Sequence, residues 1–290
     1  MSYFSPETIS RIARLQVRAH HVVDGFLSGQ HNSPFTGSSI EFRQHREYAP
    51  GDDLRNLDWK VLAKQDRYYI KQYESQTNMN SALLVDASRS MNYRGPNAAM
   101  SKFDYAATCA VCVAYLLLRQ QDFVGCLKFD SSVLNSVPQK SHRAHLDDVA
   151  RCLETGGLGD KTDLQPIFST AMQRFARRGL FVLFSDLLAP RDGLRNGLKL
   201  LRGAGNEVLV IHILDDDELD FDFSGPTKFN DLESDTILRC NPRGLKAGYL
   251  EQIHAYLEEV GQICSEYRVK YQLVRTSTPL DAALTVAFQT

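Results

Sequence analysis

The sequence predicts an α/β fold in which helices cover both faces of a doubly wound, mostly parallel sheet. Unbroken apolar runs, of the kind found in strands buried on both faces, occur at residues 82–85, 180–184 and 208–211. Segments long enough to form helices separate these runs. Strands that alternate with helices are typical of parallel sheets, because each crossover needs a long connection.

Residues 1–75 are expected to form an N-terminal helix and a small β extension. Residues 5–27 fit an amphipathic helix, with Ser5 as its N-cap and Pro6 in its first turn. The following segment, 40–74, carries turn residues around Pro50 between stretches rich in aromatic and branched residues, which favours short strands.

Residues 76–290 are expected to form the main α/β domain. After its first strand and a helix at 102–120, a predicted hairpin at 123–137 adds one antiparallel edge strand. The acidic run 215–218 lacks the glycine and spaced ligands of a calcium loop, which favours a solvated turn over a Ca²⁺ site. The remaining predictions are helices at 142–154, 164–178, 246–267 and 279–288, strands at 179–186, 207–214 and 269–274, and a hairpin and loop at 221–244.

Composition and charge favour a soluble protein that binds neither nucleic acid nor membranes. The chain has 290 residues, 43% of them hydrophobic and 23% charged, as in ordinary soluble proteins, and its net charge of −2 does not favour nucleic acid as a partner. The longest apolar stretch, 106–118, is interrupted and too short to span a bilayer. No secretory signal is recognisable, so we expect a cytoplasmic protein without membrane insertion.

One polar motif follows the first predicted strand of the main domain directly. Asp86, Ser88 and Ser90 stand at alternating positions where that strand ends. Ligands bind at the carboxyl ends of strands in open parallel sheets, and an aspartate with two hydroxyls offers oxygen ligands only. This set suits a hard divalent cation such as Mg²⁺ or Mn²⁺, although the same residues also favour helix caps and turns.

This Asp-x-Ser-x-Ser motif resembles the metal-ion-dependent adhesion site of von Willebrand factor A domains. In that family a threonine from a second loop and an aspartate at the end of a later strand complete the site, and Thr162 and Asp186 stand in the matching order. The resemblance therefore implies a von Willebrand factor A-like domain whose metal ligands are Asp86, Ser88, Ser90, Thr162 and Asp186.

A second signature precedes the predicted domain. It resembles that of the "domain of unknown function 58" proteins, in which a von Willebrand A-like domain follows, and it comprises Phe42, Arg46, Tyr48, Pro50, Gly51, Asp52, Asp53, Arg55, Asp58 and Trp59. Its charged residues have two interpretations: salt bridges that fasten the β extension, or a partner-facing surface. The candidate partner-binding residues are Arg43, Arg46, Asp52, Asp53, Arg55, Asp58 and Trp59.

The chemistry of the motif favours binding over catalysis. A metal held mainly by neutral hydroxyls keeps much of its charge and attracts an Asp or Glu carboxylate, so we expect a non-enzymatic, metal-dependent protein-interaction module. Proteins that this chain resembles are commonly encoded beside MoxR-type AAA+ ATPases. The resemblance therefore implies such an ATPase as a partner, and the residue chemistry alone implies only an acidic partner, so we expect the ATPase, an acidic client protein, or both, in a bacterial cytoplasm.

The alternative is a metal-dependent phosphatase or hydrolase that uses Asp86. Phosphoryl transfer of the haloacid dehalogenase kind normally pairs the nucleophile with a second aspartate two residues later, and Ser88 occupies that position. Residues 156–162 resemble a phosphate-binding loop only superficially, because Asp160 replaces the glycine before the lysine. Ser185 has no glycine elbow for a hydrolase triad.

Overall fold

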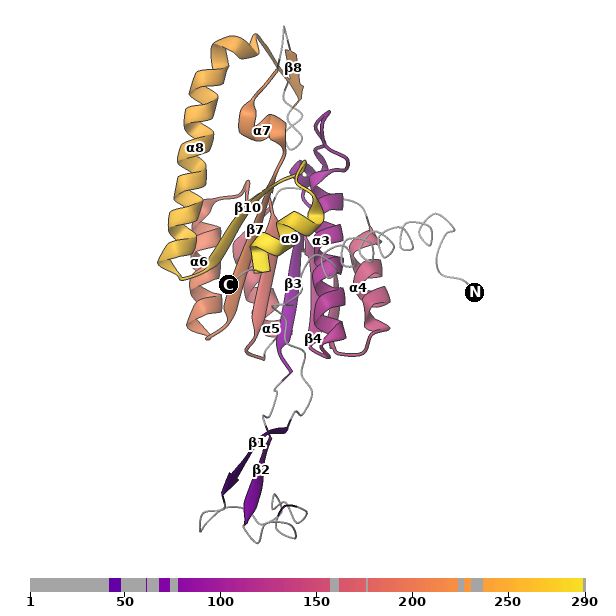
Figure 1. The fold of residues 1–290 in the computed structure, drawn as a ribbon. Helices are drawn as coiled ribbons and strands as arrows, with labels where there is room; N and C mark the ends of the chain where they lie inside the picture. Colours follow the sequence, from indigo (N-terminus) through magenta and orange to yellow (C-terminus); the bar gives the residue numbers. More distant parts are fainter. Residues whose placement is uncertain are drawn as a thin grey trace, which may run out of the picture. The chain divides into compact units, whose positions relative to one another are not determined.

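The computed structural model describes two compact units (Figure 1). The smaller lies within Phe35–Asn78 and the larger within Met79–Thr290. The described residues are 42–47, 61, 68–73, 78–156, 162–175, 177–223, 227–230 and 237–288, so the helix expected at 5–27 lies outside them.

A six-stranded sheet forms the centre of the larger unit. Its order is β10-β7-β6-β3-β4-β5, and every neighbouring pair is parallel except β4 and β5. This arrangement confirms the predicted doubly wound sheet and its antiparallel edge strand. The strands are β3 (Asn80–Asp86), β4 (Phe123–Phe129), β5 (Val133–Lys140), β6 (Leu180–Ser185), β7 (Glu207–Leu214) and β10 (Lys270–Arg275).

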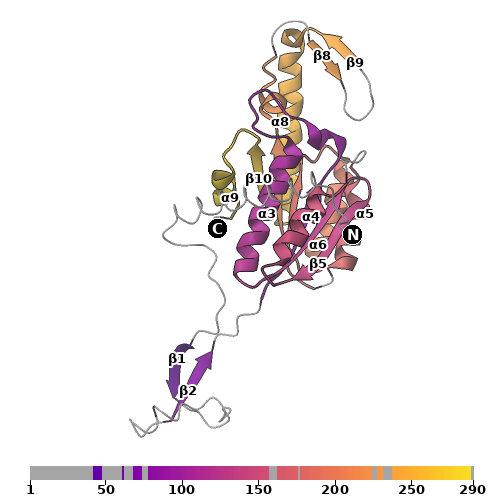
Figure 2. The same cartoon turned by 90° about the vertical axis from the view of Figure 1, so that its right-hand side faces the viewer.

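Helices cover both faces of this sheet (Figures 1 and 2). On one face, α3 (Lys102–Arg119) packs against β3 and β4 and contacts α4 (His145–Glu154) and α9 (Leu280–Phe288). The other face is covered by α5 (Leu164–Arg174), α6 (Arg191–Gly203) and α8 (Pro242–Glu266). A short helix, α7 (Asp216–Asp220), follows β7.

Two small antiparallel pairs complete the described elements. In the smaller unit β1 (Phe42–Glu47) pairs with β2 (Tyr69–Tyr73), as the predicted β extension requires. In the larger unit β8 (Thr227–Asn230) pairs with β9 (Ile237–Cys240), within the hairpin expected at 221–244.

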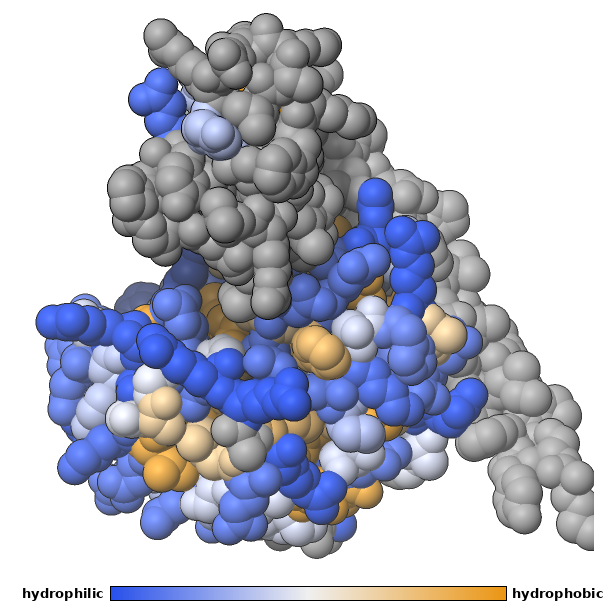
Figure 3. Space-filling view, turned by 90° about the horizontal axis from the view of Figure 1, so that it is seen from below, coloured by the Kyte–Doolittle hydropathy of each residue, from blue (hydrophilic) through white to orange (hydrophobic). Residues whose placement is uncertain are grey.

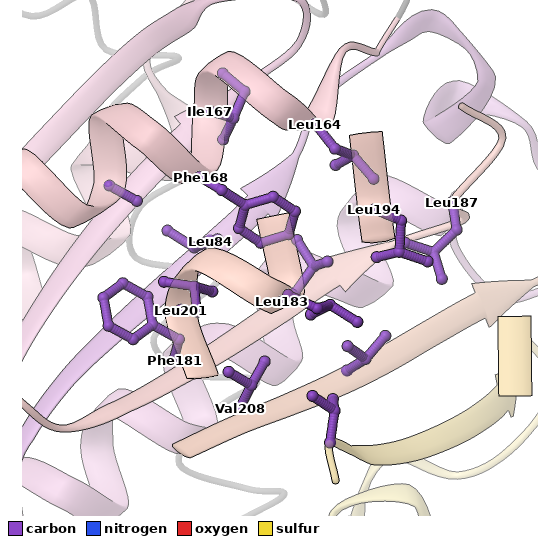
Figure 4. Close-up of a cluster of buried hydrophobic side chains, with 14 of the residues drawn as sticks. Leu84, Leu164, Ile167, Phe168, Phe181, Leu183, Leu187, Leu194, Leu201 and Val208 are labelled. Atoms are coloured by element: carbon purple, nitrogen blue, oxygen red, sulfur yellow. The ribbon is translucent and has the colours of Figure 1, made fainter. Parts of the chain in front are cut away.

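The hydrophobic core on the α5–α6–α8 face fixes the position of β3. Successive side chains of a strand point to opposite faces, so Ala82 and Leu84 join the cluster of this face, and Leu83 and Val85 are buried on the other. Figure 4 shows Leu84 beside Phe168 of α5, among side chains from α6 and the neighbouring strands. Because β3 is buried on both faces, its carboxyl end is held rigidly.

The opposite end of the larger unit, where the parallel strands begin, carries mostly hydrophilic side chains. In Figure 3 the described surface at this end shows small, separate hydrophobic areas rather than one large patch. No helix among the described residues is both long and apolar enough to span a membrane.

Candidate metal site

The predicted site residues come together at the carboxyl ends of β3 and β6, which are adjacent parallel strands. Asp86 is the last residue of β3, and Asp186 directly follows β6. Parallel strands end at the same edge of a sheet, so the two carboxylates are brought together although 100 positions separate them in the sequence.

Asp86 is fully buried, and the protein supplies hydrogen bonds to both of its carboxylate oxygens. The backbone N–H of Ser88 donates to Oδ1 at 2.9 Å, and the Thr162 hydroxyl lies 3.1 Å from each oxygen. The hydroxyl of Ser185, the last residue of β6, donates to Oδ2 at 2.5 Å. One neighbouring residue and two segments distant in sequence therefore fix this carboxylate in one orientation.

Three hydroxyls lie at the carboxyl ends of these strands. The Thr162 hydroxyl donates to Asp86, and the side chains of Ser88 and Ser90 are buried in the turn after β3. The Oγ atoms of the two serines are 3.1 Å apart. When Asp86 is ionised it only accepts hydrogen bonds, so the Thr162 hydroxyl donates to it and keeps oxygen lone pairs for a cation.

Local structure explains why these hydroxyls occupy these positions. A single turn of 3-10 helix, Arg89–Asn92, follows Ser88 and turns the chain so that Ser90 is buried beside Ser88. Asp163 caps α5 by accepting a hydrogen bond from the Gln165 N–H at 3.2 Å, which places Thr162 just outside the first turn.

Asp186 is held from several sides. Its Oδ2 accepts a hydrogen bond from the Lys102 ammonium at 2.8 Å, and its Oδ1 accepts one from the backbone N–H of Leu188 at 3.2 Å. Its carbonyl oxygen accepts hydrogen bonds from the Tyr256 hydroxyl at 3.1 Å and from Nε2 of His212 at 2.8 Å. Burial lowers the pKa of His212 to about 4, so its ring is neutral at physiological pH, and Nε2 carries the proton.

The two aspartates are in different electrostatic states. Burial, and next the charge of Asp186, raise the pKa of Asp86 from 3.8 to about 7. Burial alone would also raise the pKa of Asp186, but attraction to Lys102 outweighs it and lowers that pKa below its ordinary value. Asp186 is therefore ionised, whereas Asp86 lacks a nearby positive charge.

The donor set fits a divalent cation. With Asp86, Asp186 and Glu218 ionised and Lys102 protonated, the cluster carries a formal charge of −2, which one divalent ion would neutralise. Every candidate ligand atom is an oxygen, as Mg²⁺ and Mn²⁺ prefer. Within the described residues no group of three or more His, Cys, Asp and Glu side chains is placed to hold a metal, so the fit rests on two carboxylates together with three hydroxyls.

Comparison with known proteins places the chain in a family. A family model described as "Protein of unknown function DUF58" matches residues 44–255. The chain belongs to the DUF58 family. This DUF58 chain is 27% identical over 235 residues to the uncharacterized proteins Mb1516 of Mycobacterium bovis and Rv1480 of Mycobacterium tuberculosis. The matched region covers 80% of this chain and 73% of each relative.

Two of the solved structures that match this chain come from Bacteroides species. BatB, a conserved hypothetical protein of Bacteroides thetaiotaomicron, is 15% identical with a TM-score of 0.50, and the match covers 72% of the DUF58 chain and 97% of BatB. An aerotolerance-related membrane protein of Bacteroides fragilis is also 15% identical, with a TM-score of 0.49 and coverage of 73% and 98%. At this identity the similarity to BatB concerns the fold alone.

The structure adds residues that the sequence analysis did not assign to the site. Ser185 was considered only as a possible nucleophile, and here it orients Asp86. Lys102 was expected only as the start of a helix, and it is fully buried against Asp186. The only sequence signal for Lys102 is its place after Ser101, whose hydroxyl caps α3 by accepting a hydrogen bond from the Asp104 N–H at 3.1 Å.

The acidic run 215–218 differs from the expected solvated turn. Asp215 is buried, caps α7, and accepts hydrogen bonds from the Gly95 N–H at 3.1 Å and the Thr276 hydroxyl at 2.7 Å. Asp217 accepts a hydrogen bond from the Tyr93 hydroxyl at 2.7 Å. These carboxylates therefore hold the loop that follows the Asp-x-Ser-x-Ser motif.

The predicted partner-binding residues belong to the smaller unit. Arg43 and Arg46 lie in β1, where only the backbone is described. The remaining five lie outside the described residues and are Asp52, Asp53, Arg55, Asp58 and Trp59.

Proposed function

We propose that this DUF58 protein is a non-enzymatic, metal-dependent protein-interaction module. In this proposal its larger unit is von Willebrand factor A-like, and Asp86, Ser88, Ser90, Thr162 and Asp186 form a metal-ion-dependent adhesion site for Mg²⁺ or Mn²⁺. The observation that carries the proposal is the contact of Thr162 with both oxygens of Asp86, because 76 positions separate the two residues. A cap-and-turn cluster would need only local hydrogen bonds.

The geometry supports a division of roles between the hydroxyls and the carboxylates. Protein donors already engage both oxygens of each aspartate, so the hydroxyls of Ser88, Ser90 and Thr162 are the better direct ligands. The aspartates would orient these hydroxyls and hold metal-bound water. Neutral ligands leave the ion with much of its charge, so its open coordination position favours a carboxylate from the partner protein.

The proposed partner is a MoxR-type AAA+ ATPase or an acidic client protein. This part of the proposal rests on the resemblance to DUF58 proteins encoded beside such ATPases, together with the preference of the site for a carboxylate. It places the protein in the cytoplasm of a bacterium, where it would act as an adaptor of the ATPase.

The alternative, a phosphatase or hydrolase that uses Asp86, is less compatible with the geometry. Asp86 is fully buried, and its two oxygens accept hydrogen bonds from three residues, which leaves it poorly placed for in-line attack. Turnover of a panel of phosphoesters with Mg²⁺, abolished by Asp86→Asn, would favour the enzyme over the binding module.

Pull-down of the MoxR-type ATPase from the same organism tests the proposed function. We expect EDTA to weaken the complex more than moderate salt does, because a metal–oxygen bond is screened less than surface charge pairs. Without the metal, Asp86 and Asp186 would repel the partner's carboxylate. Thr162→Ala should weaken binding without changing net charge, and Thr170→Ala, at a half-buried position of α5, is the matched control.

Undiminished binding in EDTA, with Thr162→Ala and Thr170→Ala behaving alike, would contradict the role of the metal. That result would move the interface to another surface, and the charged segment from Arg43 to Lys71 would be the next candidate.

A further inference from the structure

A lysine without solvent exposure lies beside the candidate metal site. The Lys102 ammonium is 2.8 Å from Oδ2 of Asp186 and 2.6 Å from Oε1 of Glu218, and its side chain is 0% exposed. Burial alone would lower the pKa of Lys102, but attraction to the two carboxylates outweighs it and raises that pKa above its ordinary value. With a carboxylate oxygen on each side, Lys102 keeps the positive charge that lysine ordinarily carries.

The protein holds this charge in a fixed position. Lys102 is the first residue of α3, and its backbone N–H donates to the Tyr93 carbonyl at 3.0 Å. Glu218 is fixed in turn, because its Oε2 accepts a hydrogen bond from the Asp215 N–H at 2.8 Å in the capping box of α7. The ammonium is thus held between two anchored carboxylates.

A second buried lysine in the same unit shows that this arrangement is specific to the site. Lys128 of β4 is also buried, but its ammonium donates to backbone carbonyls of Leu153, Thr155 and Gly156 at 3.0–3.3 Å. Its hydrogen-bond acceptors are therefore neutral. Of the two, only Lys102 places its charge directly on a candidate metal-site residue.

We propose that Lys102 determines the specificity of the site: its ammonium occupies an oxygen of Asp186, so a bound metal relies on hydroxyl ligands and keeps the charge that attracts a carboxylate. This inference rests on the proposed function. A free Asp186 oxygen would instead coordinate the metal, neutralise part of its charge, and fill the position that a partner's carboxylate needs.

Charge counting gives the direction of the effect. With Lys102 present, the ionised cluster carries −2, a divalent metal brings it to zero, and one incoming carboxylate brings it to −1. Without Lys102 the cluster carries −3, so the metal binds more strongly, but the metal-bound site already carries −1 and repels a carboxylate. Lys102 thus lowers the affinity of the site for the metal and raises the affinity of the metal-bound site for a carboxylate.

Calorimetric titration with Mn²⁺ tests this inference on the full chain. Four proteins are compared: the wild type, Lys102→Met, the double variant Lys102→Met/Glu218→Gln, and Lys128→Met as the matched buried-lysine control. Each titration is run in chloride and in acetate at equal ionic strength. Acetate is the carboxylate probe, and its binding to free Mn²⁺ affects all four proteins equally.

We expect Lys102→Met to bind Mn²⁺ at least about tenfold more tightly than the wild type in chloride. Acetate should strengthen Mn²⁺ binding to the wild type and should have little effect on Lys102→Met. Lys128→Met should retain the wild-type response to acetate. The double variant carries −2, as the wild type does, but leaves an oxygen of Asp186 free. If Lys102→Met alone does not fold, a loss of the acetate response in the double variant supports the role of Lys102, and a wild-type response overturns it.

The outcomes separate this inference from the proposed function. Mn²⁺ binding to wild type and Lys102→Met with equal affinity and equal acetate response would overturn the role of Lys102 and leave the metal site standing. An absence of Mn²⁺ binding to every protein would overturn both. If only the two Lys102 variants bound Mn²⁺, the proposed function would be overturned. The inference that Lys102 weakens metal binding would be supported.

Discussion

Asp86 is the residue on which the candidate metal site depends. The sequence motif identified it because a carboxylate and two hydroxyls follow a buried strand, and the resemblance supplied Thr162 and Asp186. The sequence did not predict that Ser185 donates a hydrogen bond to Asp86, or that Lys102 donates one to Asp186. Their side chains carry no motif, and their role arises only when distant segments meet.

Replacement of Asp86 gives the first residue-scale prediction. Calorimetry should find one Mn²⁺ per wild-type chain, and Asp86→Asn should weaken that binding strongly, because the amide keeps the shape of the side chain and removes its charge. Asp122→Asn is the control: Asp122 is buried beside the amino end of β4, and its Oδ1 accepts the Met79 N–H at 2.8 Å. Equal loss of binding in both variants would indicate a general structural defect instead of a lost ligand site.

The second residue-scale prediction concerns pH. Without a metal the folded protein holds a proton on Asp86 up to about pH 7, whereas the unfolded chain loses it near 3.8, so this residue makes the metal-free fold less stable as pH rises between these values. Mn²⁺ must displace that proton below pH 7. Its affinity should therefore fall roughly tenfold from about pH 8 to about pH 6.

A pH profile of Mn²⁺ affinity measures this effect directly. Asp122→Asn should keep the wild-type slope. A flat profile for the wild type would show that Asp86 does not titrate in the site.

At the scale of elements, apolar periodicity predicted the strands well, and the ends of several helices less well. The helix expected at 142–154 begins at His145, and the one expected at 246–267 begins earlier, at Pro242, where Asn241 caps it. The acidic α7 was missed, although Asp215 and Glu218 have the spacing of a capping box and form one. Contacts with Gly95, Thr276 and Tyr93, which the sequence does not show, hold the same carboxylates.

The central strand β3 and the loop that it carries should respond differently to substitution. Leu84→Ala should lower the free energy of unfolding by about 2–5 kcal/mol, because it opens a cavity in a fully buried strand. Ser88→Ala should lower metal-free stability by only about 0.5–1.5 kcal/mol, because it removes the hydrogen bond of a buried hydroxyl and opens no large cavity. Denaturant unfolding without metal measures both, and equal destabilisation would make Ser88 a structural residue of the fold.

The contact between the motif loop and α7 gives another prediction for an element. At Gly95 an added Cβ would lie 2.2 Å from Oδ1 of Asp215, so Gly95→Ala should destabilise the protein by about 1–3 kcal/mol. Gly248→Ala is the control, because it lies within α8 with no atom within 4 Å of an added Cβ, and it should stabilise the protein by up to about 1 kcal/mol. Thermal unfolding of both variants tests the assignment, and a neutral Gly95→Ala would show that the loop is not held by Asp215.

At the scale of the whole molecule, the fold class followed from alternation of strands and helices, and the position of the site followed from the rule that parallel strands end together. The charge state of the site did not follow from the sequence, because the net charge of −2 for the chain says nothing about which charges are buried together. The structure supplies that information in the cluster of Asp86, Asp186, Lys102 and Glu218.

Anomalous diffraction from a crystal grown with Mn²⁺ tests the central claim most directly, because it locates the metal without assuming its ligands. The account predicts one peak at the carboxyl ends of β3 and β6, with the hydroxyl oxygens of Ser88, Ser90 and Thr162 about 2.0–2.2 Å away. Lys102 should remain on Asp186 in that crystal. A map with no peak there, or with its peak at the carboxylates of 215–220, would contradict the account.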